Sequence, residues 1–267
     1  MAIPKKIHWC WLSGDPLPKY LQKCVESWKR VMPDYEIILW DKNRFDIHSV
    51  KFVEDACTAR KWAFAADYIR LYALYTEGGI YLDSDVRTWR RFDEFLHLGV
   101  FSSVEYYHNL LSCRSAEYEF AGYYIQAAIL GAEKGHGLIK LCLEHYQDEK
   151  EFKLREGNAV DVEPITDVLV RYAHKYYGLD WNYPLDKPQV LKDNIVIYPP
   201  SVFARIWGEQ TMQSYAVHVG QGSWFDDKSL QATKKQSFIR KFYMYLCRNS
   251  RFVGMLHYKR QHFFDKS

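Results

Sequence analysis

The sequence predicts an α/β fold with a parallel sheet, and three observations support this prediction. Short apolar segments of strand length alternate with amphipathic stretches of helix length from residue 7 to residue 82. Turn-forming residues separate these segments, beginning with Ser13-Gly14-Asp15-Pro16. The chain has 267 residues, of which 48 % are hydrophobic, so it can bury a sizeable core and is no disordered, collagen-like or coiled-coil protein.

The first elements read as strand, helix and strand. Residues 7–12 alternate in polarity and are rich in bulky side chains, which predicts a strand. Residues 18–31 repeat apolar side chains at helical spacing and are followed by Pro33, which predicts a helix and its end. Residues 35–40 form the second predicted strand, so a parallel pair joined by a helix is the expected start of the sheet.

A strong helical pattern over residues 58–76 ends at Gly78-Gly79, and glycine readily leaves a helix with positive φ. Residues 80–82 then predict a short buried strand, which stops at Asp83-Ser84-Asp85. Two carboxylates are therefore expected at the carboxyl end of a strand, where open α/β sheets usually bind ligands. Later signals are weaker: residues 100–106, 123–130, 190–198 and 215–219 are expected to be extended, and residues 138–146 and 164–176 helical.

The charge of the chain is strongly segregated. The whole sequence has a net charge of +3, which is no signature of a nucleic-acid-binding protein. Residues 228–264 contain nine Lys and Arg and no acidic residue, so the rest of the chain carries about −6. We expect one folded domain over residues 1–227 and a basic, aromatic helical extension over residues 228–267. The extension either lies on an anionic membrane surface or packs against the domain.

Neither the cysteines nor the N-terminus indicates export. Six cysteines are scattered without a C-x-x-C pair, which favours reduced thiols over a zinc cage or a disulfide framework. The apolar run within residues 7–12 is too short for a signal peptide. We therefore expect a cytoplasmic protein, with peripheral contact to the inner face of the plasma membrane if the extension binds lipid.

Asp83 and Asp85 are separated by one residue, so a turn there can aim both carboxylates at one cation. Mg²⁺ and Mn²⁺ prefer carboxylate oxygens, and such an ion can neutralise a diphosphate and promote its departure. A solvated acidic turn is the alternative. Asp67 and Arg70 lie on one face of the preceding helix, either as ligands of a phosphate or sugar or as an ordinary helical ion pair.

A second compact group occurs late in the domain and contains His218, Gly220, Ser223 and Trp224. The imidazole could complete the coordination of a metal, while the hydroxyl and indole groups could face anionic oxygens. A buried structural histidine is the alternative. On the first strand, Trp9 and Trp11 should face the same side, so one of them could stack on a nucleobase while the other belongs to the core.

The order of these pieces resembles that of a known family. The chain reads Ile3-Pro4-Lys5-Lys6-Ile7-His8-Trp9-Cys10-Trp11, then Ala65-Ala66-Asp67-Tyr68-Ile69-Arg70, then Gly78-Gly79-Ile80-Tyr81-Leu82-Asp83-Ser84-Asp85-Val86, and finally His218 with Ser223-Trp224. This arrangement is similar to that of the DXD sugar transferases of glycosyltransferase family 32. That family includes Och1-like mannosyltransferases and bacterial capsular polysaccharide transferases.

The resemblance implies a GT-A fold, with a Rossmann-like nucleotide-sugar-binding domain and a mixed central sheet. It also implies a nucleotide-sugar donor, Mn²⁺ or Mg²⁺ as the cofactor, and transfer that retains the anomeric configuration. Carried over by position, Trp11 would stack on the base and Asp67 would contact ribose or the donor sugar. Arg70 would bind the sugar or the diphosphate.

The resemblance implies a role for the other matched positions as well. Asp83 would hold ribose, the sugar or a water in the shell of the metal, and Asp85 would ligate the metal directly. His218 would be a further metal or phosphate ligand. Ser223 and Trp224 would close over the diphosphate.

The resemblance thus implies a hexosyltransferase that acts on a glycan or lipid-linked oligosaccharide, and we favour a UDP-sugar over GDP-mannose as its donor. Gln126 stands where relatives often place an asparagine near the sugar, so it joins Asp83, Asp85 and Arg70 as a candidate catalytic residue, beside the anomeric carbon. One alternative is a phosphatase of the haloacid dehalogenase type, whose motifs Asp83-Ser84-Asp85-Val86 and Asp226-Asp227 imitate. The other is a catalytically silent carbohydrate-binding domain of the same fold.

Overall fold

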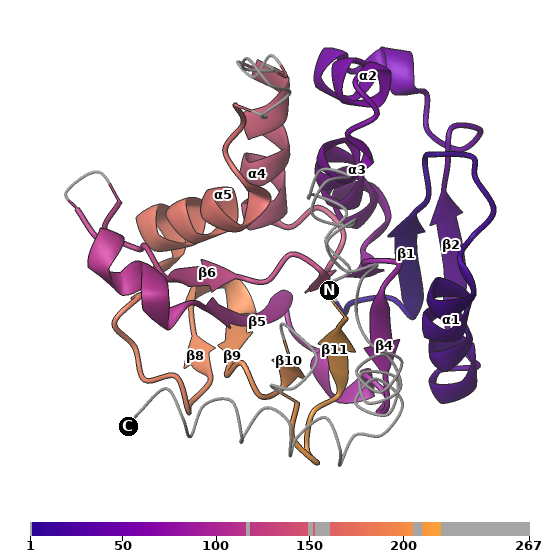
Figure 1. Ribbon diagram of the computed structural model, residues 1–267. Helices are drawn as coiled ribbons and strands as arrows, with labels where there is room; N and C mark the ends of the chain where they lie inside the picture. The colour runs from indigo at the N-terminus through magenta and orange to yellow at the C-terminus, as the bar shows by residue number, and fades with distance from the viewer. Residues whose placement is uncertain (1, 116–117, 149–151, 153–160, 205–209, 220–267) are drawn as a thin grey trace, which may run out of the picture.

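The computed structural model describes residues 2–115, 118–148, 152, 161–204 and 210–219. Its main feature is a mixed eight-stranded sheet (Figure 1), which confirms the α/β class and the mixed central sheet expected above. The strands of this sheet are β1 (Lys6–Cys10), β2 (Glu36–Trp40), β3 (Gly79–Leu82), β5 (Val100–Tyr106), β6 (Tyr123–Ile125), β7 (Ile129–Ala132), β8 (Gln189–Val190) and β9 (Ile195–Tyr198). Their order is β2-β1-β3-β7-β5-β9-β8, with β6 paired to β5.

The directions of the strands bring three strand ends to one edge of the sheet. β1 is parallel to β2 and to β3, and helix α1 (Lys19–Val31) connects β1 to β2. β7 is antiparallel to both β3 and β5, so β3 and β5 point in the same direction. The carboxyl ends of β1, β3 and β5 therefore lie along the same edge, in that order.

A second sheet joins distant parts of the chain through three short strands. These are β10 (Phe203–Ala204), β11 (Ala216–His218) and β4 (Val86–Thr88), in that order. β4 follows the Asp83-Ser84-Asp85 turn, and β11 runs antiparallel to it. The indole N–H of Trp28 in α1 donates to the Val86 carbonyl at 2.7 Å, which fixes β4 against that helix.

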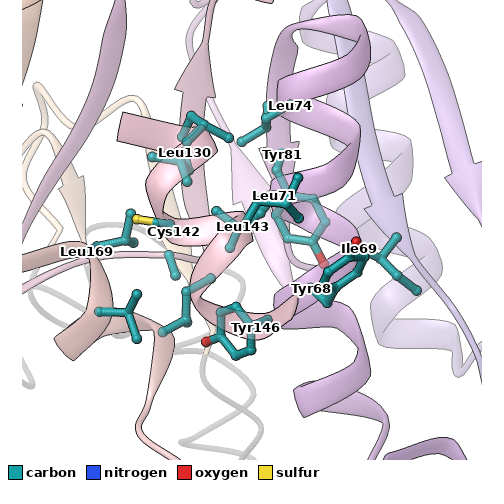
Figure 2. Packing of buried hydrophobic residues seen from close by; sticks show 14 of the residues in the cluster. Tyr68, Ile69, Leu71, Leu74, Tyr81, Leu130, Cys142, Leu143, Tyr146 and Leu169 are labelled. Atoms are coloured by element: carbon teal, nitrogen blue, oxygen red, sulfur yellow. The ribbon is translucent and has the colours of Figure 1, made fainter. Parts of the chain in front are cut away.

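Helices cover both faces of the large sheet. On one face lie α2 (Lys51–Thr58), α3 (Trp62–Glu77), α4 (Gly137–Asp148) and α5 (Ile165–Tyr172), which share the larger core. Figure 2 shows part of this core, where Leu71 of α3 and Leu143 of α4 lie beside Tyr81 of β3. The other face packs around Trp28 of α1 and Phe203 of the small sheet.

The predicted helix over residues 58–76 differs at its start from the observed one. Arg60 has a φ of 57°, so the chain turns there and separates α2 from α3. The end agrees with the prediction, because Gly78 leaves α3 with a φ of 67°. A Cβ at Gly78 would lie 2.7 Å from the Lys134 amide nitrogen, so the position has no room for a side chain.

Two segments predicted as single strands are divided. Residues 123–130 form β6 and part of β7, with a bend at residues 126–128 between them. Residues 190–198 are interrupted at Asp193 and Asn194, which both have a φ of 55°. The predicted helix over residues 164–176 is α5 followed by a π-helical turn, Ala173–Tyr177.

The basic extension over residues 228–267 lies outside the described residues, so its predicted helix and its surface stay predictions. Within the described part of the chain, no helix is both long and apolar enough to span a membrane. The cysteines found there are free thiols: Cys10, Cys24, Cys57, Cys113 and Cys142.

Candidate active site

The acidic pair follows β3 directly and is shaped by two backbone hydrogen bonds. The Asp83 amide donates to the Ala128 carbonyl at 2.9 Å, and the Val86 amide donates to the Asp83 carbonyl at 2.9 Å. The chain therefore turns tightly between β3 and β4. The Asp83 and Asp85 side chains are 26 % and 14 % exposed, so both are shielded yet reachable from solvent.

His218 is brought to this turn by the pairing of the small sheet. It is the last residue of β11 and lies opposite Val86 of β4, and the Val219 amide donates to the Asp85 carbonyl at 3.0 Å. The His218 Nε2 atom lies 3.2 Å from Asp85 Oδ1 and 3.9 Å from Asp83 Oδ2. Residues 135 positions apart in the chain thus meet at one point.

These three side chains fit a divalent cation. Each offers one ligand atom, and these atoms lie within 4.8 Å of one another. Two carboxylate oxygens and one imidazole nitrogen are a donor set that Mn²⁺ accepts well. Burial disfavours the imidazolium form, but Asp85, Asp83 and Glu105 outweigh burial and raise the pKa of His218 to about 9. A cation that binds here must therefore displace a proton.

Arg70 is buried next to Asp83. Its guanidinium is 3 % exposed and contacts two carboxylates, Asp67 Oδ1 at 2.8 Å and Asp83 Oδ1 at 3.4 Å. A third bond runs from the Arg70 Nη1 atom to the Ala127 carbonyl at 2.7 Å. The guanidinium also lies 4.6 Å from the ring centroid of Tyr81. Arg70 is therefore held in one orientation, with a fixed positive charge next to Asp83.

Asp67 is the buried partner that holds Arg70. It is 1 % exposed, and its side chain sits one helical turn before Arg70 on α3. Burial raises the pKa of Asp67 against the pull of Arg70. The two residues do form a helical ion pair, as one of the two alternatives predicted, but the pair is buried. Their role as ligands of a phosphate or sugar stays a prediction.

Gln126 lies in the bend between β6 and β7 and has an unusual environment. Its side chain is fully buried, and neither its amide nitrogen nor its amide oxygen has a hydrogen-bond partner among the described residues. The Gln126 backbone is well bonded, since its amide donates to Ser103 and its carbonyl accepts from the Ser102 hydroxyl. An unpaired buried amide is costly, which indicates that a further group is needed to satisfy it.

Trp11 lies just beyond the carboxyl end of β1, at the same edge of the sheet. Its side chain is half-buried against the smaller core, and its indole N–H donates to the Asp15 carbonyl at 2.7 Å. This bond fixes the ring in the loop after β1. Ser223, Trp224 and Gly220 lie outside the described residues, so their predicted contacts with a diphosphate stay predictions.

Several contributors to this site are not apparent from the spacing of the motifs. The Ala127 and Ala128 carbonyls hold Arg70 and Asp83, and backbone acceptors carry no residue-type signal. Glu105, near the end of β5, faces the same region and acts on His218. Its signal was a carboxylate at the end of a predicted strand, the same signal that identified Asp83.

The family comparison covers the first part of the site. Residues 18–100 match the model of the glycosyltransferase sugar-binding region containing a DXD motif. The chain is 32 % identical over 103 residues to inositol phosphoceramide mannosyltransferase 3 of Schizosaccharomyces pombe, with 36 % of this chain and 28 % of the relative covered. It is 30 % identical over 105 residues to the uncharacterized glycosyltransferase L373 of Acanthamoeba polyphaga mimivirus, with 37 % and 42 % covered.

The chain thus spans less than half the length of each of these relatives. Among solved structures, it is similar to a galactosyltransferase, LgtC, in complex with donor and acceptor sugar analogs. The TM-score is 0.46 and the identity 15 %, with 84 % of this chain and 91 % of that chain covered. Asp67, Arg70, Asp83 and Asp85 all lie within the matched segment. Residues 18–100, and the four site residues within them, are therefore similar to the glycosyltransferase sugar-binding region that contains a DXD motif.

Proposed function

We propose that this chain is a metal-dependent glycosyltransferase that moves a hexose from a nucleoside diphosphate sugar to a glycan or a lipid-linked oligosaccharide. The observation that supports this proposal most directly is the meeting of Asp83, Asp85 and His218 beside the buried Arg70. Two carboxylates and an imidazole can hold a divalent cation, and a neighbouring guanidinium can bind the diphosphate.

Asp83, Asp85 and His218 would hold Mn²⁺ or Mg²⁺. When bound, the ion neutralises the diphosphate and acts as a Lewis acid on the leaving group. Arg70 adds positive charge that does not have to be reoriented during the reaction, because Asp67 and the Ala127 carbonyl already fix its guanidinium. Trp11 would stack on the nucleobase, because it lies just after β1, the strand next to β3.

The transfer breaks the bond between the anomeric carbon and the phosphate oxygen, and the bonding electron pair leaves with the nucleoside diphosphate. The oxygen of an acceptor hydroxyl forms the new bond to the anomeric carbon, and its proton passes to an oxygen of the leaving phosphate. Gln126, the predicted neighbour of the anomeric carbon, is an uncharged amide and therefore a poor nucleophile. We therefore propose attack from the face of the leaving group, with retention of configuration.

Release of the nucleoside diphosphate tests the proposal. The purified chain is incubated with UDP-glucose, UDP-galactose or GDP-mannose, with and without Mn²⁺, and the released UDP or GDP is measured. We expect metal-dependent release from a UDP-sugar, at least a hundredfold lower rate in Asp85→Asn, and a rate within twofold of wild type in Asp55→Asn. Asp55 is the matched control because it pairs with Lys51 on α2. Absence of release from every donor, or equal rates in Asp85→Asn and wild type, would contradict the proposal.

Neither alternative function is favoured by an observation. The segment that imitates a phosphatase loop lies inside the matched sugar-binding region, and Asp226-Asp227 lie outside the described residues. A phosphatase would hydrolyse p-nitrophenyl phosphate but release nothing from a nucleotide sugar. A silent carbohydrate-binding domain would bind the donor without cleaving it. The same incubation, with a parallel one in p-nitrophenyl phosphate, therefore separates all three functions.

The place of action is a further part of the proposal. We propose that the enzyme works in the cytoplasm, where the basic extension over residues 228–267 would contact the anionic inner face of the membrane. Lipid-linked acceptors, such as precursors of a bacterial capsular polysaccharide, would then lie within reach of the sheet edge. The support is the segregation of charge along the chain.

A further inference from the structure

A second group of polar side chains lies along the edge of the sheet, next to the three proposed metal ligands Asp83, Asp85 and His218 (the metal-binding triad). Trp11 and Asp83 directly follow β1 and β3, and Glu105 is the next-to-last residue of β5. The three lie at one edge of the sheet in this order, because β7 is antiparallel to both β3 and β5. If the nucleobase lies at Trp11 and the diphosphate at Asp83, the acceptor must approach from the remaining side. That side is built by β5, β6 and α5, which lies beside β6 (Figure 1).

Glu105 faces this side from β5. It pairs with Tyr124 of β6, its carboxylate accepts a bond from the Tyr107 hydroxyl, and it acts electrostatically on His218. It also acts on Asp167 of α5. Glu105 is therefore the link between the metal-binding triad and the group on α5.

Asp167 is a buried carboxyl group whose negative charge has few hydrogen-bond donors or cations to stabilise it. It is 6 % exposed, and its Oδ1 atom accepts a bond from the Thr166 hydroxyl at 3.1 Å. Arg171 is the cation that acts on it, but its guanidinium is already bonded to both oxygens of Glu163, at 3.1 and 2.6 Å. Burial raises the pKa of Asp167 to about 6. The carboxyl thus retains acceptor capacity that the described side chains do not use.

Gln126 is an independent sign that a ligand belongs here. The register pairs Ile125 with Val104, and the next residue, Gln126, bonds to Ser103. Gln126 therefore follows the last residue of β6, two residues after Tyr124, which pairs with Glu105. Its amide is fully buried, and both of its polar atoms are unpaired among the described residues. Hydroxyl groups of a bound molecule could donate to its oxygen and accept from its nitrogen.

Aromatic rings border the same group. Tyr124 lies 6.1 Å from Phe120, and Phe120 lies 6.2 Å from Trp181, between ring centroids. All three side chains are half-buried, so they offer apolar surface next to the carboxylates. A sugar ring has both matching features, since its C–H faces pack on aromatic rings and its hydroxyls bond to carboxylates and amides.

We propose that Glu105, Gln126 and Asp167, with Tyr124, Phe120 and Trp181, form the subsite for an uncharged acceptor sugar. The proposal rests on the proposed function and adds the class of the acceptor. Two carboxylates at the subsite repel a carboxylate or phosphate on the incoming sugar, because like charges at close range are unfavourable. Neutral saccharides are therefore accepted, and uronic acids or sugar phosphates are excluded.

Saturation-transfer NMR on the full chain with Mg²⁺ and UDP tests the subsite. The probes are lactose and methyl α-glucopyranoside, with methyl glucuronide as the anionic counterpart. Wild type is expected to bind at least one neutral probe, and at least tenfold more tightly than the glucuronide. Asp167→Asn is expected to lose at least tenfold in that affinity and to discriminate less against the glucuronide. Glu144→Gln removes the same charge from the exposed face of α4 and is expected to change neither.

Metal-dependent donor hydrolysis in the absence of acceptor separates this inference from the proposed function. Asp167→Asn is expected to hydrolyse the donor within twofold of wild type. Trp181→Leu, in a half-exposed loop, is the second variant and is expected to weaken neutral probes without lowering hydrolysis. If wild type hydrolyses the donor but binds no neutral probe, or if both variants bind as wild type does, the subsite is refuted while the function stands. Absence of donor hydrolysis in wild type refutes the function itself.

Discussion

At the scale of single residues, Arg70 determines the electrostatics of the site. One buried guanidinium serves Asp67, Asp83 and the Ala127 carbonyl. Removing either charge of a buried pair leaves the other without compensation in a medium of low dielectric constant. Arg70 is therefore needed both for the stability of α3 against the sheet and for the positive charge next to the proposed diphosphate site.

Replacing Arg70 with methionine is expected to lower the free energy of unfolding by about 3–5 kcal/mol, because Asp67 is left as an uncompensated buried acid. Urea unfolding followed by circular dichroism measures this loss. Arg44→Met is the control, since Arg44 pairs with Glu77 at the surface and should cost about 1 kcal/mol or less. Equal losses in the two variants would contradict the role assigned to burial.

His218 predicts a link between metal binding and protons. Because the pKa of His218 is raised to about 9, the imidazole is protonated at pH 7.5 and must release its proton when it ligates a cation. We expect Mn²⁺ binding at pH 7.5 to release about one proton, and the apparent affinity to fall about tenfold per pH unit below that pKa. Calorimetry in buffers of different ionisation enthalpy measures the release. His218→Gln should bind more weakly and release none, whereas a wild type that releases none would exclude His218 as a ligand.

The residues that could be found from the sequence are those whose chemistry is local. Asp83 and Asp85 stand two apart after an apolar strand, so their common direction followed from one turn. The isolation of Gln126 could not be predicted, because it depends on the bend after β6 and on which partners fail to reach a buried amide. His218 and Asp85 meet only through the register of β11 on β4, which short-range patterns do not specify.

At the scale of elements, the backbone conformation of a few residues explains where the predictions differ from the structure. The apolar pattern continues through residues 58–76, but Arg60 adopts positive φ and divides it. α2 was not predicted, although Phe52, Val53, Ala56 and Cys57 provide its buried face. The bend between β6 and β7 likewise interrupts an apolar run. At residues 58–76 and 123–130 the hydrophobic pattern was continuous, and the break had a conformational cause.

Gly131 of β7 has no side chain, and this leaves room for the ring of Phe101 at the centre of the sheet. It lies opposite Phe101 of β5, and a Cβ there would come within 2.6 Å of Phe101 Cδ1. Gly131→Ala is expected to cost about 1–3 kcal/mol of unfolding free energy through overpacking. The combination with Phe101→Leu should cost less than the sum of the single changes. Urea unfolding of the four proteins measures the coupling, and strict additivity would contradict it.

At the scale of the whole molecule, the sheet separates two cores, and the candidate site lies where both meet the strand ends. Asp83 and Asp85 connect β3, which lies between the two cores, to β4, which belongs to the smaller one. A ligand at this turn binds only the folded chain and should raise its apparent stability. The segregation of charge is the other property of the whole chain. Residues 228–264 alone carry a charge of about +9, which is more than the net charge of +3 of the whole chain.

The proposed membrane contact is tested by co-sedimentation with vesicles. Vesicles of phosphatidylglycerol and phosphatidylcholine are expected to retain the full chain at low salt, and neutral vesicles to retain little, because the nine basic side chains of residues 228–264 are attracted to an anionic surface. Binding should fall as salt is raised. A chain ending at residue 227 is the matched comparison. If it sediments as the full chain does, the extension is not the membrane contact.

The bend at residues 126–128 connects the two halves of the proposed reaction. The carbonyls of its last two residues accept hydrogen bonds from Arg70 and the Asp83 amide, while the side chain of its first residue, Gln126, borders the proposed acceptor subsite. A donor that binds to Asp83 and Arg70 would therefore fix the position of Gln126 before any acceptor binds. Steady-state kinetics should therefore show a compulsory order in which the nucleotide sugar enters first and the free nucleotide leaves last.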